Sequence, residues 1–328
     1  MMLDDEILIT GAAGFIGSCM ASYLQKKGFK NLILVDDFSK LDKKNNFEAL
    51  KNYTFIERDL LENYLKEHSS IKNIIHFGAR TDTTEQDNSI FEKLNINFSK
   101  MLWQYSCENK INFIYASSAA TYGDGKLGYE DNEKNIQFLK PLNPYGISKQ
   151  VFDEFVLEQV AQKNTPKKWA GLKFFNVYGP NEYHKKRMAS VIFHAFNQIK
   201  KNNSITLFKS HKQEYNDGEQ KRDFIYVKDI LQVTEFILDN DFKSGIYNLG
   251  SGNARTFNDL ANAIFTALNL PVSINYIDTP IDIRASYQYF TEANMEKLKS
   301  TGYENNFYSI EDGVEDYLKN YLMNETNF

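Results

Sequence analysis

The stretch from Ile7 to Asp37 constrains the fold most strongly, because its order of apolar and glycine residues fits few structures. A short apolar strand, Ile7 to Thr10, is followed by a turn with glycine at 11, 14 and 17, and then by a helical pattern that runs to Leu24. A second apolar strand, residues 31–35, ends in a carboxylate at Asp36. The stretch therefore predicts a first βαβ unit of a parallel sheet.

The glycine-rich turn has a mechanical reason for each glycine. Gly11 permits the turn at the end of the strand, Gly14 lets a pyrophosphate approach the backbone, and Gly17 lets the helix pack closely on the sheet. The first residues of the helix that follows are Phe15 and Ile16. This helix end offers free N–H groups and the positive end of the helix dipole to phosphates. We expect these five residues to bind a dinucleotide.

Length and composition exclude several classes of protein. The 328 residues suffice for one large or two modest domains, and a net charge of -5 gives no basic footprint for nucleic acid. No apolar run reaches the roughly 18 residues of a membrane span, and the acidic N-terminus lacks a signal-peptide layout. We expect a cytoplasmic protein without membrane contact. Cys19 and Cys107 have no metal-ligand spacing, so they are predicted to be packing residues and no metal site is expected.

Further short apolar strands end in residues that could contact a ligand. Ligands of open α/β sheets lie past the carboxyl ends of the strands. The strand that begins at Ile71 predicts cofactor contacts at Phe77, Gly78, Ala79, Arg80 and Thr81. Asp59 follows the strand before it, and either contacts the cofactor or caps the next helix. His76 lies within an apolar run and is predicted to be a core histidine with satisfied hydrogen bonds.

A serine, a tyrosine and a lysine carry the predicted chemistry. Ser118 follows the strand 111–116, while Tyr145 and Lys149 lie one turn apart on one face of a helix. Lowering a phenol pKa by about three units needs roughly 4 kcal/mol, which an ammonium about 4 Å away supplies. Tyr145 would then take the proton of a substrate hydroxyl while a hydride leaves the same carbon for a nicotinamide, and Ser118 would hold the oxygen.

A basic cluster follows the strand predicted over residues 169–177. It comprises Lys185, Lys186 and Arg187, in a chain that is acidic overall. Such a run is often a solvated surface, but its place just past a strand end favours contact with a diphosphate or a sugar.

These motifs resemble the extended branch of the short-chain dehydrogenase/reductase superfamily and, nearly end to end, its ADP-glycero-manno-heptose 6-epimerase family. The segments that carry the likeness are 116–123, 141–146, 173–180, 184–191, 222–229 and 287–291. The resemblance implies an α/β fold with a doubly wound parallel sheet (Rossmann) over residues 1–175, to which 222–240 returns. A smaller C-terminal α/β substrate domain would span residues 176–328.

The family resemblance implies inversion of carbon 6 of the heptose in ADP-D-glycero-β-D-manno-heptose, a step in lipopolysaccharide core synthesis. One tightly bound nicotinamide cofactor per subunit would oxidise and re-reduce the sugar, with Tyr145 and Lys185 as bases on opposite faces and Lys186 as a rival of Lys185. The resemblance also implies a homo-oligomer, often a pentamer. It adds Asn95 and Lys149 as cofactor contacts, and as substrate contacts Ser118, Asn176, Val177, Arg187, His194, Phe208, Arg222 and Tyr287, with further contacts from the segment 282–287.

The choice of cofactor stays open at this point. Asp36 favours NAD, because an acid there usually binds the ribose 2′-hydroxyl, and Asp37 adds a charge that would repel a 2′-phosphate. The family is described with NADP, whose phosphate Lys43 or its neighbours Lys40 and Lys44 could meet. We expect NADP, with NAD as the alternative.

Three other functions compete with this prediction. A nucleotide-hexose 4-epimerase fits the serine, tyrosine and lysine equally well and is the alternative. A 4,6-dehydratase would need an acid pair where Ala119 and Ala120 stand. A nucleotide-sensing protein without chemistry would be expected to lack the pair Tyr145 and Lys149.

Overall fold

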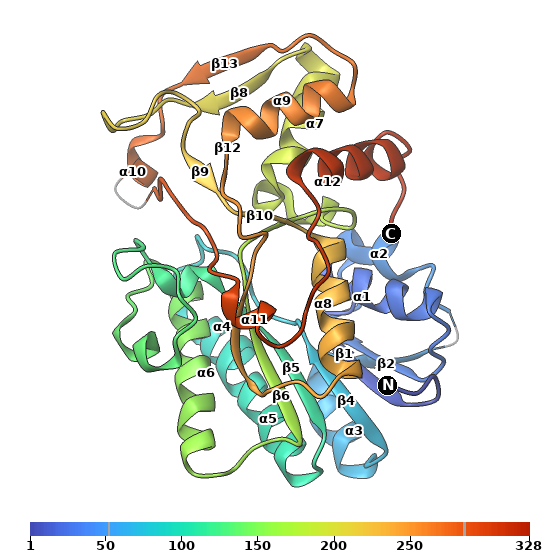
Figure 1. Cartoon of the computed structure of the whole chain (residues 1–328). Helices are drawn as coiled ribbons and strands as arrows, with labels where there is room; N and C mark the ends of the chain where they lie inside the picture. The colour runs from blue at the N-terminus through green and yellow to red at the C-terminus, as the bar shows by residue number, and fades with distance from the viewer. Residues whose placement is uncertain (52, 285–286) are drawn as a thin grey trace.

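The computed structural model describes residues 1–51, 53–284 and 287–328 (Figure 1). Ala285 and Ser286, which belong to the segment expected to contact substrate, lie outside the described residues. A seven-stranded sheet in the order β11-β6-β5-β4-β1-β2-β3 forms the centre of the molecule, and every neighbouring pair is parallel. Its strands are β1 (Glu6–Thr10), β2 (Leu32–Asp36), β3 (Thr54–Glu57), β4 (Ile71–His76), β5 (Asn112–Ser118), β6 (Lys168–Phe174) and β11 (Gly245–Leu249). This doubly wound order confirms the predicted fold class.

Helices flank the sheet because their apolar faces cover its buried strands (Figure 1). The helix α1 packs with α8, and α6 packs with α4 and with the π-helical segment Glu92–Asn97. The helices of this part are α1 (Phe15–Lys26), α2 (Lys44–Phe47), α3 (Leu61–Glu67), α4 (Asn88–Phe91), α5 (Phe98–Glu108), α6 (Pro144–Ala161), α8 (Val227–Asp239) and α11 (Glu296–Lys299). Both α8 and β11 return to the sheet late in the chain. We propose a division of the chain into two domains near residue 175.

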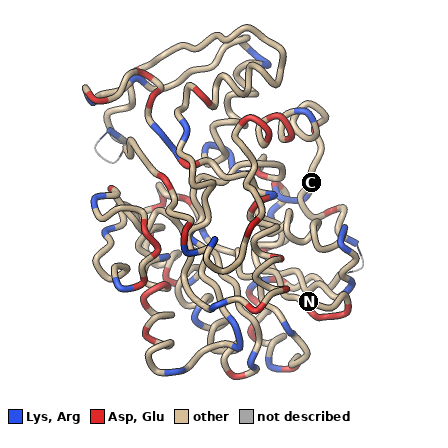
Figure 2. Tube along the Cα trace, viewed as in Figure 1, with Lys and Arg blue, Asp and Glu red and all other residues tan. Residues whose placement is uncertain are grey.

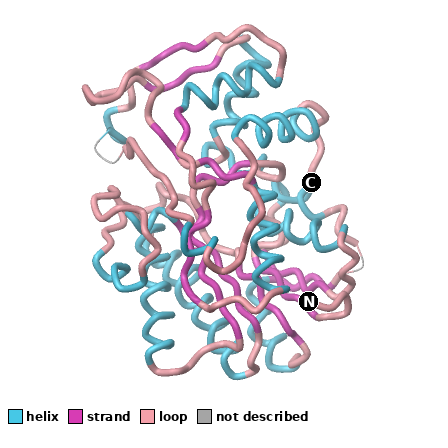
Figure 3. The backbone as a smooth tube through the Cα atoms, viewed as in Figure 1, coloured by secondary structure: helices cyan, strands magenta, loops and turns pink. Residues whose placement is uncertain are grey.

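A smaller group of elements forms the upper part of Figure 1. The strands β8 and β13 pair in parallel, β9 and β12 pair antiparallel, and α9 packs against both α7 and α12. Its elements are α7 (Val191–Asn202), β8 (Ile205–Phe208), β9 (Lys221–Arg222), β12 (Arg255–Thr256), α9 (Phe257–Ala267), β13 (Ile274–Ile277), α10 (Ile281–Arg284) and α12 (Ile310–Tyr317). Loops and short strands connect this part to the sheet (Figure 3). Acidic and basic residues are scattered over both parts (Figure 2).

The sixth strand differs from the prediction of one strand over residues 169–177. The strand β6 ends at Phe174, and β7 (Asn176–Tyr178) leaves the sheet to pair with β10 (Phe224–Tyr226). The break occurs because the N–H of Asn176 donates to the carbonyl of Asp223 rather than to a strand of the sheet. The chain thereby turns toward the upper part directly after the edge where ligands of such sheets bind.

The structure gives one finding about membranes. In the described parts of the chain, no helix is both long enough and apolar enough to cross a bilayer.

A buried carboxyl in α8 makes stability depend on pH. Asp229 is 1% exposed and accepts a hydrogen bond from the Tyr308 N–H. Burial raises the pKa of Asp229 to about 7, although the N–H groups of Tyr308 and Tyr226 act in the opposite direction. The folded chain therefore keeps this proton up to about pH 7, whereas the unfolded chain loses it near pH 4. Stability falls as the pH rises through this window.

We predict that Asp229→Asn removes this pH dependence, because the amide keeps the acceptor oxygen and cannot ionise. Between pH 5 and 8, the free energy of unfolding of the wild type should fall relative to that of the variant, by up to about 3 kcal/mol. Urea unfolding at several pH values measures this difference. Asp241→Asn, in an exposed residue just beyond α8, serves as the control. Parallel curves for the wild type and Asp229→Asn would contradict the prediction.

Candidate active site

The glycine-rich turn joins three elements at distances that side chains would prevent. A Cβ on Gly17 would lie 2.1 Å from the Gly11 carbonyl oxygen, so α1 could not pack on the turn. Gly11 has a φ of +72°, and a Cβ there would lie 2.7 Å from the backbone nitrogen of Gly78. The strand β1, the helix α1 and the loop after β4 therefore meet at this turn.

The carboxylate of Asp36 anchors the turn from the end of β2. It accepts hydrogen bonds from the N–H of Ala13 at 2.9 Å and from Asp37 at 2.7 Å, and it forms an ion pair with Lys43 Nζ at 2.9 Å. Asp37 instead accepts hydrogen bonds from Ser39, which lower the pKa of Asp37, and lies 3.7 Å from Lys40. The structure thus brings Asp36 and Lys43 together at the turn.

Asp59 does not cap a helix, so that alternative is wrong. No side chain caps the 3-10 turn that contains it or the following α3. Its exposed carboxylate pairs with Arg58 at 3.1 Å, and this pairing lowers the pKa of Asp59.

Asn95 holds the loop after β4 rather than facing solvent. Its buried amide accepts from the Arg80 N–H at 2.8 Å and donates to the Arg80 carbonyl at 3.0 Å and to Ser148 Oγ at 2.9 Å. In the same loop, Phe77, Gly78 and Ala79 are partly buried, while Arg80 and Thr81 are exposed.

His76, at the end of β4, is a core histidine as predicted. Its two ring nitrogens bond Thr10 Oγ1 at 2.6 Å and Ser99 Oγ at 2.7 Å, and burial lowers the pKa of His76 to about 3.

The predicted serine, tyrosine and lysine lie at the end of β5 and the start of α6. Asn143 caps α6, and Pro144 occupies its first turn, so that Tyr145 follows directly. Lys149 Nζ donates to the Ala116 carbonyl at 2.8 Å and lies 6.0 Å from the centroid of the Tyr145 ring. Burial lowers the pKa of Lys149 to about 8.

The pKa of Tyr145 differs from our expectation that a lysine lowers it. Burial raises the pKa of Tyr145 above its ordinary value, although the Ser118 hydroxyl acts in the opposite direction. The ammonium of Lys149 is bonded to a backbone carbonyl and does not offset this burial. A buried phenol is favoured in its neutral form, so Tyr145 carries its proton near neutral pH.

Lys185 faces the glycine-rich turn, whereas its neighbours do not. It lies in the 3-10 segment Tyr183–Met188, and its Nζ is 5.4 Å from the centroid of the Phe15 ring. Burial lowers the pKa of Lys185, while the carboxylate of Glu182 acts in the opposite direction. Lys186 is exposed, and the exposed Arg187 lies 3.7 Å from Asp82 rather than in the interior.

Three of the predicted substrate residues come together in the upper part. The guanidinium of Arg222 is 9% exposed and lies 5.4 Å from the centroid of the Tyr287 ring, which is itself 6.2 Å from the ring of Phe208. Burial lowers the pKa of Arg222, and the nearby tyrosines Tyr287, Tyr129 and Tyr215 act in the opposite direction.

The other predicted substrate residues lie on β7 and α7. Asn176 is exposed on β7 and donates to the Asp223 carbonyl at 3.1 Å, next to the partly buried Val177. His194 is partly buried on α7, beside Phe193.

Comparison with known proteins assigns the family. Residues 7–250 match the NAD dependent epimerase/dehydratase family. The chain is 46% identical to the ADP-L-glycero-D-manno-heptose-6-epimerase of Fusobacterium nucleatum, over 98% of this chain and 99% of that protein. The chain belongs to the ADP-L-glycero-D-manno-heptose-6-epimerase family. A relative with this name from Nitratidesulfovibrio vulgaris is 42% identical over 96% of the chain and 97% of its own length.

Solved structures support membership of the heptose-6-epimerase family. The ADP-L-glycero-D-manno-heptose-6-epimerase of Helicobacter pylori has a TM-score of 0.82 and 30% identity, and the match covers 97% of this chain and 96% of that one. A UDP-N-acetylglucosamine 4-epimerase from Methanobrevibacter ruminantium has a TM-score of 0.81 at 23% identity and covers 99% of this chain and 100% of that one. At this identity the second likeness shows the fold alone. The predicted resemblance is thus confirmed.

As a member of this NAD dependent family, the chain uses a nicotinamide cofactor, and its residues fit one. No side chain caps the N-terminus of α1, so its first N–H groups remain available to phosphate oxygens. The three glycines leave the turn without side chains where a pyrophosphate approaches. The fit does not distinguish NADP from NAD.

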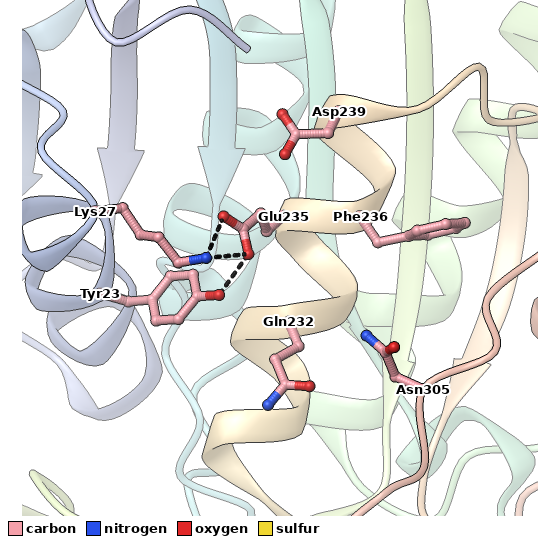
Figure 4. A pocket seen from close by; sticks show the side chains of 7 residues that line it. All are labelled: Tyr23, Lys27, Gln232, Glu235, Phe236, Asp239 and Asn305. Atoms are coloured by element: carbon pink, nitrogen blue, oxygen red, sulfur yellow. Dashed lines mark hydrogen bonds and ion pairs between the residues drawn. The ribbon is translucent and has the colours of Figure 1, made fainter.

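Two cavities in the described part of the chain lie away from these residues. The smaller, of about 360 Å³, lies between α1 and α8, where Lys27 and Tyr23 both bond Glu235 (Figure 4). The larger, of about 670 Å³, is lined by residues of three late segments, among them Arg255, Lys299 and Tyr308. Neither contains a residue of the predicted site.

Sequence reasoning missed the residues that hold the site loops in place. The carboxylate of Asp223 accepts from the N–H groups of Ser251, Gly252 and Ala293 at 2.6 to 3.0 Å, and so fixes the loop that follows β11. Asp223 follows Arg222 in the segment 222–229, in which we predicted a ligand contact only for Arg222. Asp153 forms a fully buried ion pair with Lys173 at 2.6 Å. The sequence signal that could have identified Asp153 is its position one turn after Lys149 on the same helix.

Lys186 stores backbone strain next to Lys185. Its φ of 51° and ψ of -127° lie in a region that glycine adopts readily and a residue with a Cβ avoids. We predict that Lys186→Gly stabilises the protein by about 1 kcal/mol, because it relieves this strain. Thermal and urea unfolding measure the change. Lys201→Gly, at the exposed end of α7, is the control and should destabilise. An equal loss of stability in both variants would contradict the prediction.

Proposed function

We propose that this chain inverts carbon 6 of the heptose in ADP-D-glycero-β-D-manno-heptose to give the L-glycero isomer, a precursor of the lipopolysaccharide core. The observation that supports it is a second desolvated amine, Lys185, at the glycine-rich turn in addition to the Tyr145 and Lys149 pair. Inversion by oxidation and re-reduction needs a proton acceptor and a proton donor that reach the carbon 6 oxygen in two orientations. Two separate groups satisfy this need.

The positions of the residues support the following proposed roles. When bound, the nicotinamide accepts and returns the hydride of carbon 6, and its positive charge lowers the pKa of a nearby phenol. Tyr145 exchanges a proton with the carbon 6 oxygen, and Ser118 holds that oxygen through its hydroxyl. Lys149 is fixed by the Ala116 carbonyl beside the Tyr145 ring. Lys185 exchanges the second proton after the ketone has turned.

The substrate diphosphate would lie against the cluster of Arg222, Phe208 and Tyr287, where a buried guanidinium and two rings meet. Asn176, Val177, Arg187 and His194 are proposed as further substrate contacts. Because the reaction has no net redox change, we propose one tightly bound cofactor per subunit, regenerated at each turnover.

We propose NADP as this cofactor, with NAD as the alternative. The position of Lys43 at the end of β2 supports this choice, because its ammonium, which pairs with Asp36, would exchange that partner for a ribose 2′-phosphate. Denaturing the purified protein and weighing the released nucleotide distinguishes the two. We also propose a homo-oligomer, with a pentamer by family resemblance, which the native mass tests.

Incubation with ADP-D-glycero-β-D-manno-heptose, followed by proton NMR, tests the proposed function. The expected result is conversion to the L-glycero isomer without consumption of added nicotinamide. A nucleotide-hexose 4-epimerase is the second candidate, since it also uses a serine, a tyrosine and a lysine. Inversion of UDP-hexoses without any change in the heptose would replace our proposal by that candidate.

Replacement of Lys185 tests the second base. We predict that Lys185→Met lowers the rate of epimerisation by a factor on the order of 100 or more, because the returning proton has no donor. The bound nucleotide and the melting temperature should stay the same. Lys186→Met is the matched control, since Lys186 is exposed, and it should remain active. Full activity of Lys185→Met, or loss only in Lys186→Met, would remove Lys185 from the mechanism.

A further inference from the structure

A single buried amide in α2 connects two parts of the proposed site. Asn46 is the buried residue of this one-turn helix and is 7% exposed. Its Nδ2 donates to the Ala13 carbonyl at 3.1 Å and to the Asn181 carbonyl at 3.0 Å, and it lies 3.2 Å from His184 Nδ1. Its Oδ1 accepts from Asn327 Nδ2 at 2.9 Å. The donor and the acceptor of the Asn46 amide therefore both form hydrogen bonds with residues of other segments.

These partners belong to the glycine-rich turn and to the segment that carries Lys185. Ala13 lies within the turn, whereas Asn181 and His184 lie before Lys185 in the chain. A second contact runs parallel to the first, because Asn181 Nδ2 donates to Ser18 Oγ of α1 at 2.9 Å. The C-terminal residues lie beside α2 in Figure 1, and the Phe328 N–H donates to Asn181 Oδ1 at 2.8 Å.

The Lys185 segment needs such an attachment, because its own conformation is unfavourable. It is a short 3-10 turn interrupted by the positive φ of Lys186, and Lys186 and Arg187 are exposed. His184 can accept the Asn46 hydrogen bond because burial and the nearby lysines Lys43 and Lys185 lower the pKa of His184 to about 4, which keeps the ring neutral.

We propose that Asn46 is a positioning residue that holds the Lys185 segment against the glycine-rich turn. The inference rests on the proposed function, in which Lys185 exchanges a proton at a carbon that also faces the cofactor. Asn46 bonds both the cofactor-binding turn and the lysine segment with one amide. It therefore fixes the distance between Lys185 and the cofactor. It touches neither the reacting atoms nor the sugar.

Limited proteolysis with trypsin tests the attachment without any substrate. Lys185, Lys186 and Arg187 offer three successive cleavage sites in the segment that Asn46 is proposed to hold. Asn46→Ala should be cleaved there on the order of 10-fold faster than the wild type, because the segment opens more often. Asn45→Ala is the matched control, since Asn45 is the exposed neighbour on the same helix. Equal cleavage of Asn46→Ala and Asn45→Ala would overturn the proposal.

Kinetics distinguish positioning from a purely structural role. Asn46→Ala should lose 10- to 100-fold in kcat, with little change in KM and with the nucleotide still bound, because Asp36 still anchors the glycine-rich turn while the Lys185 segment loses its attachment. Loss of the nucleotide, or unchanged kcat, would overturn the proposal.

A second variant covers the case in which Asn46→Ala does not fold. Asn46→Asp keeps the size and the acceptor oxygen but loses both donors, so it should show the same faster cleavage and lower kcat. If the wild type does not epimerise the heptose, the proposed function fails, while the cleavage experiment still decides whether Asn46 holds the segment.

Discussion

The buried ion pair of Lys173 with Asp153 is the interaction on which the catalytic part of the site depends. Both side chains are fully buried, at an N–O distance of 2.6 Å, and breaking such a pair on one side costs about 3 to 5 kcal/mol. Asp153 also accepts from Tyr115 and Ser117, and Lys173 donates to Thr121. The network ties α6 to the ends of β5 and β6. It therefore fixes the helix that carries the tyrosine and lysine relative to the strand that carries the serine.

A second, uncharged network does the same on the cofactor side. His76 bonds Thr10 with one ring nitrogen and Ser99 with the other, and Ser99 donates to the Asn95 carbonyl at 2.5 Å. The Asn95 amide continues the network to Ser148 on α6. The low pKa of His76 keeps the ring neutral, so one nitrogen donates and the other accepts. The strand before the glycine-rich turn and the catalytic helix are thereby joined through side chains from five elements.

Local patterns in the sequence predicted the parts of this molecule that local interactions determine. The glycines of the first turn, the first βαβ unit and the pairing of Tyr145 with Lys149 on one helix face follow from local patterns. The split of the sixth strand could not be predicted, because the Asn176 N–H finds its acceptor in Asp223. Asn46 was missed for the same reason, since its partners are Ala13, Asn181, His184 and Asn327, and no short pattern connects them. The lowered pKa expected for Tyr145 does not follow from Lys149 alone, because burial, which depends on the whole fold, raises this pKa.

Burial shifts the pKa values of the two proposed proton-exchanging groups in opposite directions. It raises the pKa of the Tyr145 phenol and lowers that of the Lys185 ammonium, because both neutral forms need less hydration than the charged ones. A raised pKa makes the phenolate of Tyr145 a stronger base, and a lowered pKa makes the ammonium of Lys185 a readier donor of the second proton. The positive charge of an oxidised nicotinamide would lower the phenol pKa and so offset the effect of burial on Tyr145. Tyr145 would then accept the first proton, and Lys185 would supply the second one.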